Sequence, residues 1–190
     1  MKIIVLDTET AGLPRDYKAP ATDTQNWPRI IQIGWQVYVG TQLIFGESSL
    51  IKPDGFEIPA SATAVHGITT ASATAKGMDL TIILERLRTF AADLDAVVCH
   101  NAQFDLTVIA AEYARLDQTS PLARLRRICT MEAATPLLRL PGKYGWKFPR
   151  LEELHHYLFD GAFDGAHDAM NDVKATARCF FEMQRRGVIP

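Results

Sequence analysis

The sequence lacks any apolar run that could cross a membrane, and it contains little cysteine. No stretch reaches the roughly 20 apolar residues that a membrane-spanning helix requires, so we expect no membrane contact. The three cysteines, Cys99, Cys129 and Cys179, are an odd number without CxxC spacing. They indicate neither a disulfide framework nor a zinc knuckle. Because Lys2 leads directly into a strand-like run and not into a signal peptide, we expect a protein of the reducing cytoplasm.

A strong net charge is also missing, but the charges are unevenly distributed. The formal net charge of −2 does not by itself indicate a polyanionic partner. Between residues 115 and 150, however, eight basic residues are opposed by only two acidic ones. Such a stretch is either a footprint for a phosphate backbone or a solvated face. The sequence leaves both interpretations open.

The order of apolar patterns predicts one α/β domain. With 47% hydrophobic and 22% charged residues, the 190-residue chain resembles an ordinary globular domain. We predict a single domain over residues 1–190, with a proline-containing loop inserted at about 14–28. Strand patterns cover residues 2–7, 29–39, 42–51, 96–99 and 127–130. Helical patterns cover residues 79–92, 104–116, 131–138, 150–158 and 169–185. This order favours a mixed sheet with helices packed on it.

Two carboxylates stand at the end of the first predicted strand. Asp7 and Glu9 follow the apolar run over residues 3–6 and are separated by one residue. On a pleated strand they share a face and repel each other. Asp105 begins a predicted helix just past the strand at 96–99, where it could simply favour the helix dipole. Asp172 lies on the inward edge of a small or apolar helix face, an unfavourable place for a lone charge.

Divalent metal ions would explain how these four acids are tolerated together. Converging carboxylates raise one another's pKa strongly unless cations lie between them, and hard oxygen ligands favour Mg²⁺ or Mn²⁺ over zinc. Two such ions about 3.5–4 Å apart can clamp the attacking and leaving oxygens of a phosphoryl displacement. If Asp168 is the N-cap of the last helix, His167 precedes the helix and can turn toward the same place. Its neutral imidazole could then accept a proton from water, although an exposed loop histidine is the simpler interpretation.

Three segments carry a family resemblance. In this order, "DTETAGL", "HNAQFD" and "HDAMND" resemble the three exonuclease motifs of the DEDD superfamily, and the histidine of the third marks its DEDDh branch. The resemblance extends from Leu6 to about Phe181. It implies a ribonuclease-H-like fold, a five-stranded mixed sheet with its second strand antiparallel, flanked by helices. It also implies 3′→5′ hydrolysis that releases nucleoside 5′-monophosphates with the help of two Mg²⁺ or Mn²⁺ ions. Because the branch includes the proofreading subunit of bacterial replicative polymerase, a polymerase is a candidate partner.

The resemblance also implies roles for individual residues. Asp7, Glu9, Asp105 and Asp172 match the metal-ligand acids, and His167 matches the general base. Residues expected to contact the 3′ end of the substrate are Thr8, Thr10, Leu13, His66, Ile68, Asn101 and Phe104. For Leu13, Ile68 and Phe104, core packing is a serious alternative.

The favoured function is therefore a metal-dependent 3′→5′ exonuclease acting on a single-stranded or frayed DNA end. One alternative is an RNA-trimming or oligoribonucleotide-degrading enzyme of the same branch, because contacts to a 2′-OH cannot be located in the sequence. Another is a non-catalytic nucleic-acid-binding or polymerase-accessory module. A calcium-binding structural domain is disfavoured because no EF-hand loop is present. Two features stay open: Trp27, which could stack on a base or pack, and the basic-aromatic loop at 142–148, which could bind a single strand or cover the core.

Overall fold

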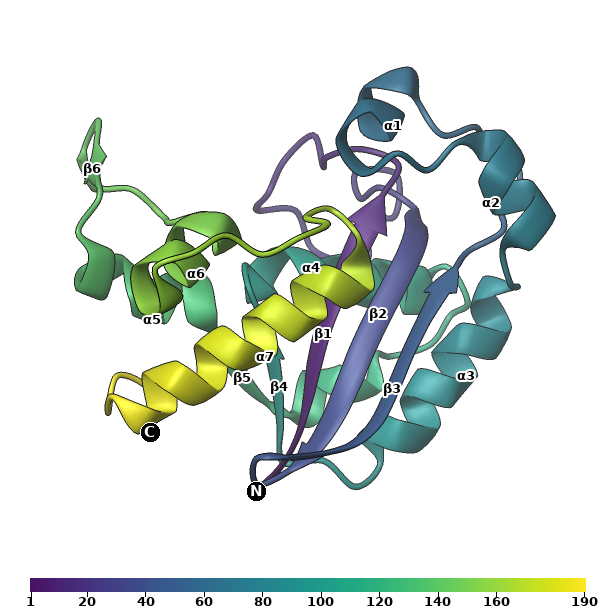
Figure 1. Ribbon diagram of the computed structural model, residues 1–190. Helices are drawn as coiled ribbons and strands as arrows, with labels where there is room; N and C mark the ends of the chain where they lie inside the picture. The colour runs from purple at the N-terminus through teal and green to yellow at the C-terminus, as the bar shows by residue number, and fades with distance from the viewer.

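A five-stranded mixed sheet forms the centre of the molecule in the computed structural model, which describes residues 1–190 (Figure 1). Its strands are β1 (Lys2–Thr10), β2 (Ile30–Val39), β3 (Gln42–Leu50), β4 (Ala96–Cys99) and β5 (Arg126–Cys129). They lie in the order β3-β2-β1-β4-β5. β2 is antiparallel to both of its neighbours, whereas β1, β4 and β5 are parallel. The predicted sheet, with its second strand antiparallel, is thus confirmed.

Helices cover both faces of the sheet. Their bounds are α1 (Ala60–His66), α2 (Thr70–Lys76), α3 (Leu80–Ala91), α4 (Ala102–Ala114), α5 (Thr130–Leu138), α6 (Leu151–Phe159) and α7 (Ala169–Arg185), with a 3-10 turn η1 (Pro121–Arg124). α7 crosses one face diagonally, and α3 and α4 lie behind the other (Figure 1). A two-stranded hairpin, β6 (Pro141–Gly142) and β7 (Gly145–Trp146), projects from the body. No helix has both the length and the apolar character needed to cross a membrane.

The alternation of β1 divides the core into two layers. Ile4 and Leu6 belong to a cluster of 23 buried residues that also includes residues of α3 and α4. Ile3 and Val5 point the other way, into a cluster of 17 buried residues shared with α6 and α7. Successive side chains of a strand alternate between faces. The four apolar residues that precede Asp7 therefore contribute to both layers of the core.

β1 is longer than the sequence predicted, and the difference creates the site. The expected strand ended at residue 7, but β1 continues to Thr10 because β2 pairs with it over its whole length. On its other side β1 pairs with β4 only from Ile3 to Val5. Residues 7–10 therefore extend beyond the end of β4 and leave a gap at the carboxyl edge of the sheet, the usual location of ligand sites in such sheets.

Two short helices were not predicted. α1 ends at Gly67, whose φ of 74° lies in the left-handed region that favours glycine. α2 begins with a capping box in which Thr69 and Ser72 exchange hydrogen bonds. Both helices are seven residues long and rich in alanine and threonine, so they carry no apolar stripe that periodicity could detect.

Candidate active site

Asp7, Thr8 and Glu9 lie on the part of β1 that extends past β4. By the alternation of the strand, Asp7 and Glu9 face the layer of α7, and Thr8 faces the layer of α4. Glu9 is only 9% exposed, although it carries a carboxylate. Water is therefore largely excluded from Glu9, and Asp7 beside it is partly buried.

Asp105 reaches the same place from the opposite layer. It stands in the first turn of α4 and is 3% exposed. Thr8 donates two hydrogen bonds to its Oδ1, from the backbone N–H at 3.0 Å and from Oγ1 at 2.8 Å. Because one oxygen accepts both bonds, the Thr8 contacts fix the carboxylate and leave Oδ2 without a hydrogen bond.

Asp172 and His167 come from the start of α7. Asp168 is the N-cap of this helix, as the sequence suggested, and accepts a hydrogen bond from the Asn171 N–H at 3.2 Å. His167 precedes the cap in the left-handed conformation, with φ of 65°, which few non-glycine residues adopt. Its backbone N–H donates to Asp172 Oδ2 at 3.0 Å. This turn holds the imidazole at the helix entrance beside the buried Asp172.

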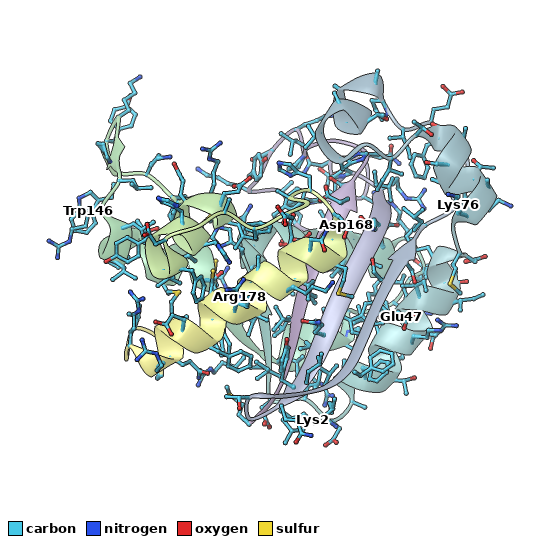
Figure 2. All side chains as sticks on the ribbon, in the orientation of Figure 1. Lys2, Glu47, Lys76, Trp146, Asp168 and Arg178 are labelled. Carbon is cyan, nitrogen blue, oxygen red and sulfur yellow. The ribbon has the colours of Figure 1, made fainter.

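Gln32 joins the start of α7 to the sheet. Its Nε2 donates to Asp168 Oδ2 at 3.0 Å, and its Oε1 accepts from the Ala169 N–H at 3.1 Å. Gln32 is the strand partner of Glu9 in the β1–β2 pairing. Gln32, which lies opposite Glu9, therefore positions α7, the helix that carries Asp172. Figure 2 shows Asp168 where α7 begins, at the end of the sheet.

The pKa values of the four candidate carboxylates are all raised. Burial is the largest cause for each, and neighbouring carboxylates add to it: the pKa of Asp7 is raised well above its usual range. The pKa of Glu9 is raised to about 8, that of Asp105 to about 7 and that of Asp172 to about 6. For Asp105 the two Thr8 hydrogen bonds oppose the rise. The folded protein thus concentrates negative charge where water stabilises it poorly.

This donor set fits divalent cations. Ligand atoms of Glu9, His167 and Asp172 all lie within 4.8 Å of one another, close enough to share one ion. Asp7 and Asp105 line the same cavity and supply further oxygen donors. Cations placed among such carboxylates would remove the repulsion that raises their pKa values.

A cavity of about 440 Å³ surrounds the carboxylates. Of the predicted residues, its lining includes Asp7, Thr8, Glu9, Leu13, Asn101, Phe104, Asp105, His167 and Asp172. Leu13 is 72% exposed, so core packing does not explain it. Phe104 both lines the cavity and packs against the larger core cluster. Asn101, at φ of 80°, makes no capping hydrogen bond with its side chain at the start of α4.

The sequence did not identify other lining residues. They are Tyr17, His100, Met131, Phe148, Pro149, Arg150, Leu151, Glu152 and Ala166. Tyr17 comes from the 14–28 loop, which the sequence predicted as an insertion without a stated role. His100 bridges Thr130 Oγ1 at 2.9 Å and the Pro149 carbonyl at 3.0 Å, and burial lowers its pKa to about 4. The adjacency of His100 to Asn101 in the second motif was the available signal.

Three predicted substrate residues lie outside the cavity lining. Thr10 donates from Oγ1 to the Gly12 carbonyl at 2.6 Å. Ile68 packs against a small cluster with Ile31 and Ile58, in agreement with the packing alternative. His66 Nδ1 accepts from the Ile68 N–H at 3.0 Å, so its Nε2 carries the proton of the neutral ring and has no partner. Burial lowers the pKa of His66, and the charge of nearby His167 lowers it further.

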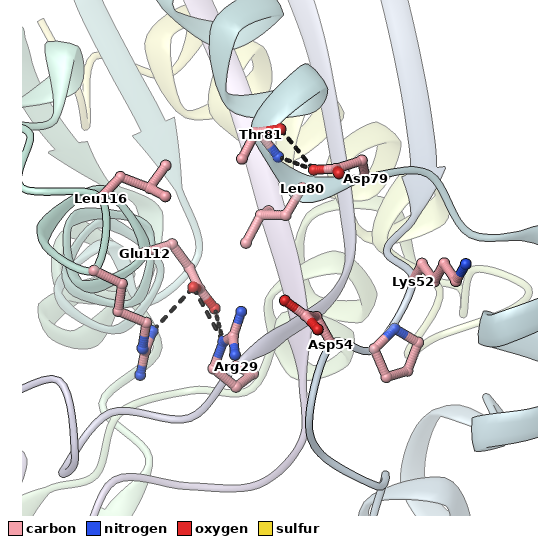
Figure 3. A pocket seen from close by; sticks show the side chains of 10 residues that line it. Arg29, Lys52, Asp54, Asp79, Leu80, Thr81, Glu112 and Leu116 are labelled. Atoms are coloured by element: carbon pink, nitrogen blue, oxygen red, sulfur yellow. Dashed lines mark hydrogen bonds and ion pairs between the residues drawn. The ribbon is translucent and has the colours of Figure 1, made fainter.

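A second cavity, of about 390 Å³, lies between Arg29, the start of α3 at Leu80 and the end of α4 at Glu112 (Figure 3). At its wall Glu112 is 1% exposed and accepts hydrogen bonds from Arg29 Nε and from the Ile30 N–H, each at 3.0 Å. Arg115 forms an ion pair with Glu112 at 3.1 Å and donates to the carbonyls of Thr24 and Trp27. These contacts tie the 14–28 loop to α4, the helix that carries Asp105.

Trp27 packs inside the same loop. It is 3% exposed, and its Nε1 donates to the carbonyls of Ala19 and Pro20 at 3.3 and 3.2 Å. The stacking interpretation of Trp27 is therefore wrong, and the packing interpretation holds. His155 is buried and His156 is exposed, and neither lines the cavity around the carboxylates.

Comparisons with known proteins agree with the fold. The model of the RNase_T exonuclease family matches residues 4–180, so the chain belongs to this family of nucleic-acid-hydrolysing enzymes. Enzymes of this kind use divalent metal ions. A Mycobacterium tuberculosis protein described as a bifunctional exonuclease/endonuclease is 28% identical over 173 residues. That match covers 91% of this chain but only 25% of the relative.

Solved structures of Escherichia coli exonuclease I share the fold. Its complex with a dT13 oligonucleotide has a TM-score of 0.76 at 24% identity, over 97% of this chain and 41% of that one. Its complex with a dA16 oligonucleotide has a TM-score of 0.75 at 24% identity, with the same coverage. The chain thus spans less than half the length of these relatives.

Proposed function

We propose that this protein is a 3′→5′ exonuclease that removes nucleoside 5′-monophosphates from a single-stranded or frayed DNA end. The observation that carries the proposal is the convergence of Asp7, Glu9, Asp105 and Asp172 from three elements at one sheet edge, with His167 beside them. The preference for DNA is supported by the likeness to exonuclease I, whose structures hold dT13 and dA16 oligonucleotides.

The four carboxylates would hold two Mg²⁺ or Mn²⁺ ions. When bound, such a pair supplies a nucleophile at neutral pH and stabilises the charge that develops on the attacking and leaving oxygens. The work of the chain is to fix the acids before substrate arrives. Thr8 does so for Asp105 with two hydrogen bonds, and the His167 N–H does so for Asp172.

His167 would act as the general base. It is exposed at the cavity, so water can reach its imidazole, while its backbone is held by the bond to Asp172. A neutral ring can accept the proton of the attacking water, and solvent can then carry it away. The ring also lies within ligand distance of Glu9 and Asp172, so a ligand role is the competing assignment.

The terminal nucleotide would lie between the loop side and the α4 side of the cavity. Leu13 and Phe104 offer apolar contact to the terminal bases, and Asn101 offers an uncommitted amide. Thr8 would contribute by positioning Asp105, since its N–H and hydroxyl both bond to that residue. Thr10, His66 and Ile68, which lie outside the lining of the cavity, would act at its rim.

The test is digestion of matched end-labelled DNA and RNA oligomers with Mg²⁺, Mn²⁺ or EDTA. We expect stepwise shortening of DNA from its 3′ end with either metal and none in EDTA. A 3′-phosphate or a closed single-stranded circle should resist attack. Faster shortening of RNA would reassign the substrate, and rapid cleavage of the circle would indicate an endonuclease. Binding without hydrolysis under every condition would favour an accessory module.

A further inference from the structure

The segment from Pro141 to Phe148, which we call the arm, lies outside the core. Its eight residues are all exposed, and β6 and β7 pair only with each other. Figure 1 shows this hairpin standing clear of the helices beside it. Folding usually buries aromatic side chains. An aromatic-rich arm without core contacts is therefore not explained by the stability of the fold.

Three aromatic rings of the arm are open to solvent. Tyr144 is 90% exposed, Trp146 is 53% exposed and Phe148 is 60% exposed. The Trp146 ring points away from the body of the molecule in Figure 2. Exposed rings in sequence along an extended segment are the platforms on which the bases of a single strand stack. The loop is solvated, as the alternative interpretation held, but its aromatic rings do not cover the core.

The charges around these rings are all of one sign. Residues 139–150 include four basic residues and no acidic one. The Arg139 guanidinium lies 5.1 Å from the centre of the Trp146 ring, and the Lys143 ammonium lies 5.0 Å from that of Tyr144. Lys147 and Arg150 are both paired with Glu153, at 2.6 and 3.8 Å, so Arg139 and Lys143 are the cations left for an anionic ligand. Each of these two rings therefore has a cation at hand for a phosphate.

The arm is continuous with the catalytic cavity. Phe148, Pro149 and Arg150 line that cavity, directly after Trp146 and Lys147. The Pro149 carbonyl is held by His100 Nε2 at 3.0 Å, which fixes the base of the arm beside Asn101. A strand whose 3′ end is in the cavity could therefore leave it over Phe148 and toward Trp146.

We propose that the arm is a second binding segment for the same single strand, upstream of the nucleotide being removed. Tyr144, Trp146 and Phe148 stack on bases, and Arg139 and Lys143 contact phosphates. This proposal rests on the proposed function for the identity of the strand. Its consequence is a dependence on substrate length, because a short oligomer fills the cavity without reaching the arm.

Tryptophan fluorescence tests this without hydrolysis. Trp27 and Trp35 are 3% and 0% exposed, so Trp146 alone among the three tryptophans is open to quenching. Titration of the full chain in EDTA with a thymidine 16-mer should quench its emission saturably. Trp146→Phe should abolish the signal. No quenching at oligomer concentrations that saturate hydrolysis would overturn the proposal, even if the enzyme is active.

Hydrolysis of oligomers of increasing length gives the second readout. For Tyr144→Ala/Trp146→Ala we expect kcat/KM on a 16-mer to fall about 5- to 150-fold for each stacked base lost. Hydrolysis of a dinucleotide should be unchanged. Tyr157→Ala removes a ring that is 48% exposed from α6 and is the control. Equal losses on both substrates, or none on either, would contradict the arm assignment, whereas a wild-type chain inactive on all lengths would instead contradict the proposed function.

Discussion

The backbone of Ala169 closes against Gly34 at the start of α7. A Cβ atom placed on Gly34 would lie 3.0 Å from the Ala169 carbonyl carbon and 3.1 Å from its oxygen. Gly34 is also the β2 partner of Asp7. The close approach of these two backbones therefore brings the helix that carries Asp172 onto the strand pair that carries Asp7.

Gly34→Ala should separate these two backbones by a few tenths of an ångström. We expect a destabilisation of about 1–3 kcal/mol and a loss of roughly tenfold in turnover, because small misplacements of catalytic groups are costly. Thermal unfolding and oligonucleotide digestion measure the two effects. Gly46→Ala is the control, since the closest contact of its Cβ would be the flexible Gln36 side chain at 3.3 Å, and the nearest backbone atom of β2 would be 3.8 Å away. Equal turnover in both variants would show that this close approach does not position the site.

The stability of the metal-free protein should fall as pH rises. Glu9, Asp105 and Asp172 have pKa values raised to about 8, 7 and 6, above the usual carboxylate values near 4 that apply when the chain is unfolded. Between about pH 4 and 8 the folded protein therefore holds more protons than the unfolded chain, and the free energy of unfolding decreases with pH. Thermal unfolding in EDTA at several pH values tests this slope.

Added Mg²⁺ or Mn²⁺ should raise the melting temperature more at pH 8 than at pH 5, because binding requires the carboxylates to lose their protons. A metal-free protein that becomes steadily more stable from pH 5 to pH 8 would contradict the assignment of these acids as a repulsive cluster.

Asp105→Asn should abolish turnover and stabilise the metal-free protein. The asparagine Oδ1 can still accept both Thr8 hydrogen bonds, while the negative charge is removed. Asp7→Ala should act in the same direction. The measurements are product formation with Mn²⁺ and thermal unfolding in EDTA. Asp23→Asn, at an exposed position in the 14–28 loop, is the control and should change neither. Turnover near that of the wild type would remove Asp105 from the ligand set.

His167→Ala should cost roughly 10²–10⁴-fold in turnover, the range for loss of a positioned acid–base group. His167→Asn should do the same with less strain, because asparagine tolerates the left-handed backbone better. Metal affinity separates the two assignments: it is preserved if the imidazole is a base and weakened if it is a ligand. His156→Ala, in the exposed part of α6, is the matched control. Unchanged turnover in both His167 variants would leave His167 as an exposed loop residue.

Glu112→Gln should release the 14–28 loop. Removing one partner of a buried ion pair costs about 3–5 kcal/mol, and here it weakens the bonds to Arg29 and Arg115 that hold the loop to α4. Because Tyr17 lines the cavity from that loop and Leu13 directly precedes the loop, KM should rise more than kcat falls. Steady-state kinetics below the melting temperature measure both. A variant with a lower melting temperature and unchanged KM would show that Glu112 contributes to stability and not to substrate binding.

The parts of the fold that repeat a clear pattern were predictable. The strand at 96–99 and the helix at 169–185 agree with the structure residue for residue, because each is bounded by a change in apolar periodicity. The extension of β1 to Thr10 was not predictable. It depends on pairing with β2, and the polar residues 7–10 give no strand pattern of their own.

Within the site, the acids and His167 were predicted because their residue types suit one chemistry. The hydrogen bonds that hold these residues in place were not predicted. The bonds from Thr8 to Asp105 and from Gln32 to Asp168 join positions 97 and 136 residues apart, and no local pattern records such contacts. For Ile68 the motif was a poor guide. The sequence motif suggested substrate contact, but the fold turns Ile68 into a small core cluster.

In the sequence, the arm separates the candidate site residues into two groups, one before it and one after it. Trypsin should cut first at its exposed Lys143 or Lys147, since such hairpin tips are preferred sites of nicking. One fragment would carry Asp7, Glu9 and Asp105, and the other would carry His167 and Asp172. The 17-residue core cluster spans both pieces and would hold them together. The enzyme is therefore a natural candidate for fragment complementation, with hydrolysis recovered only when both halves reassemble.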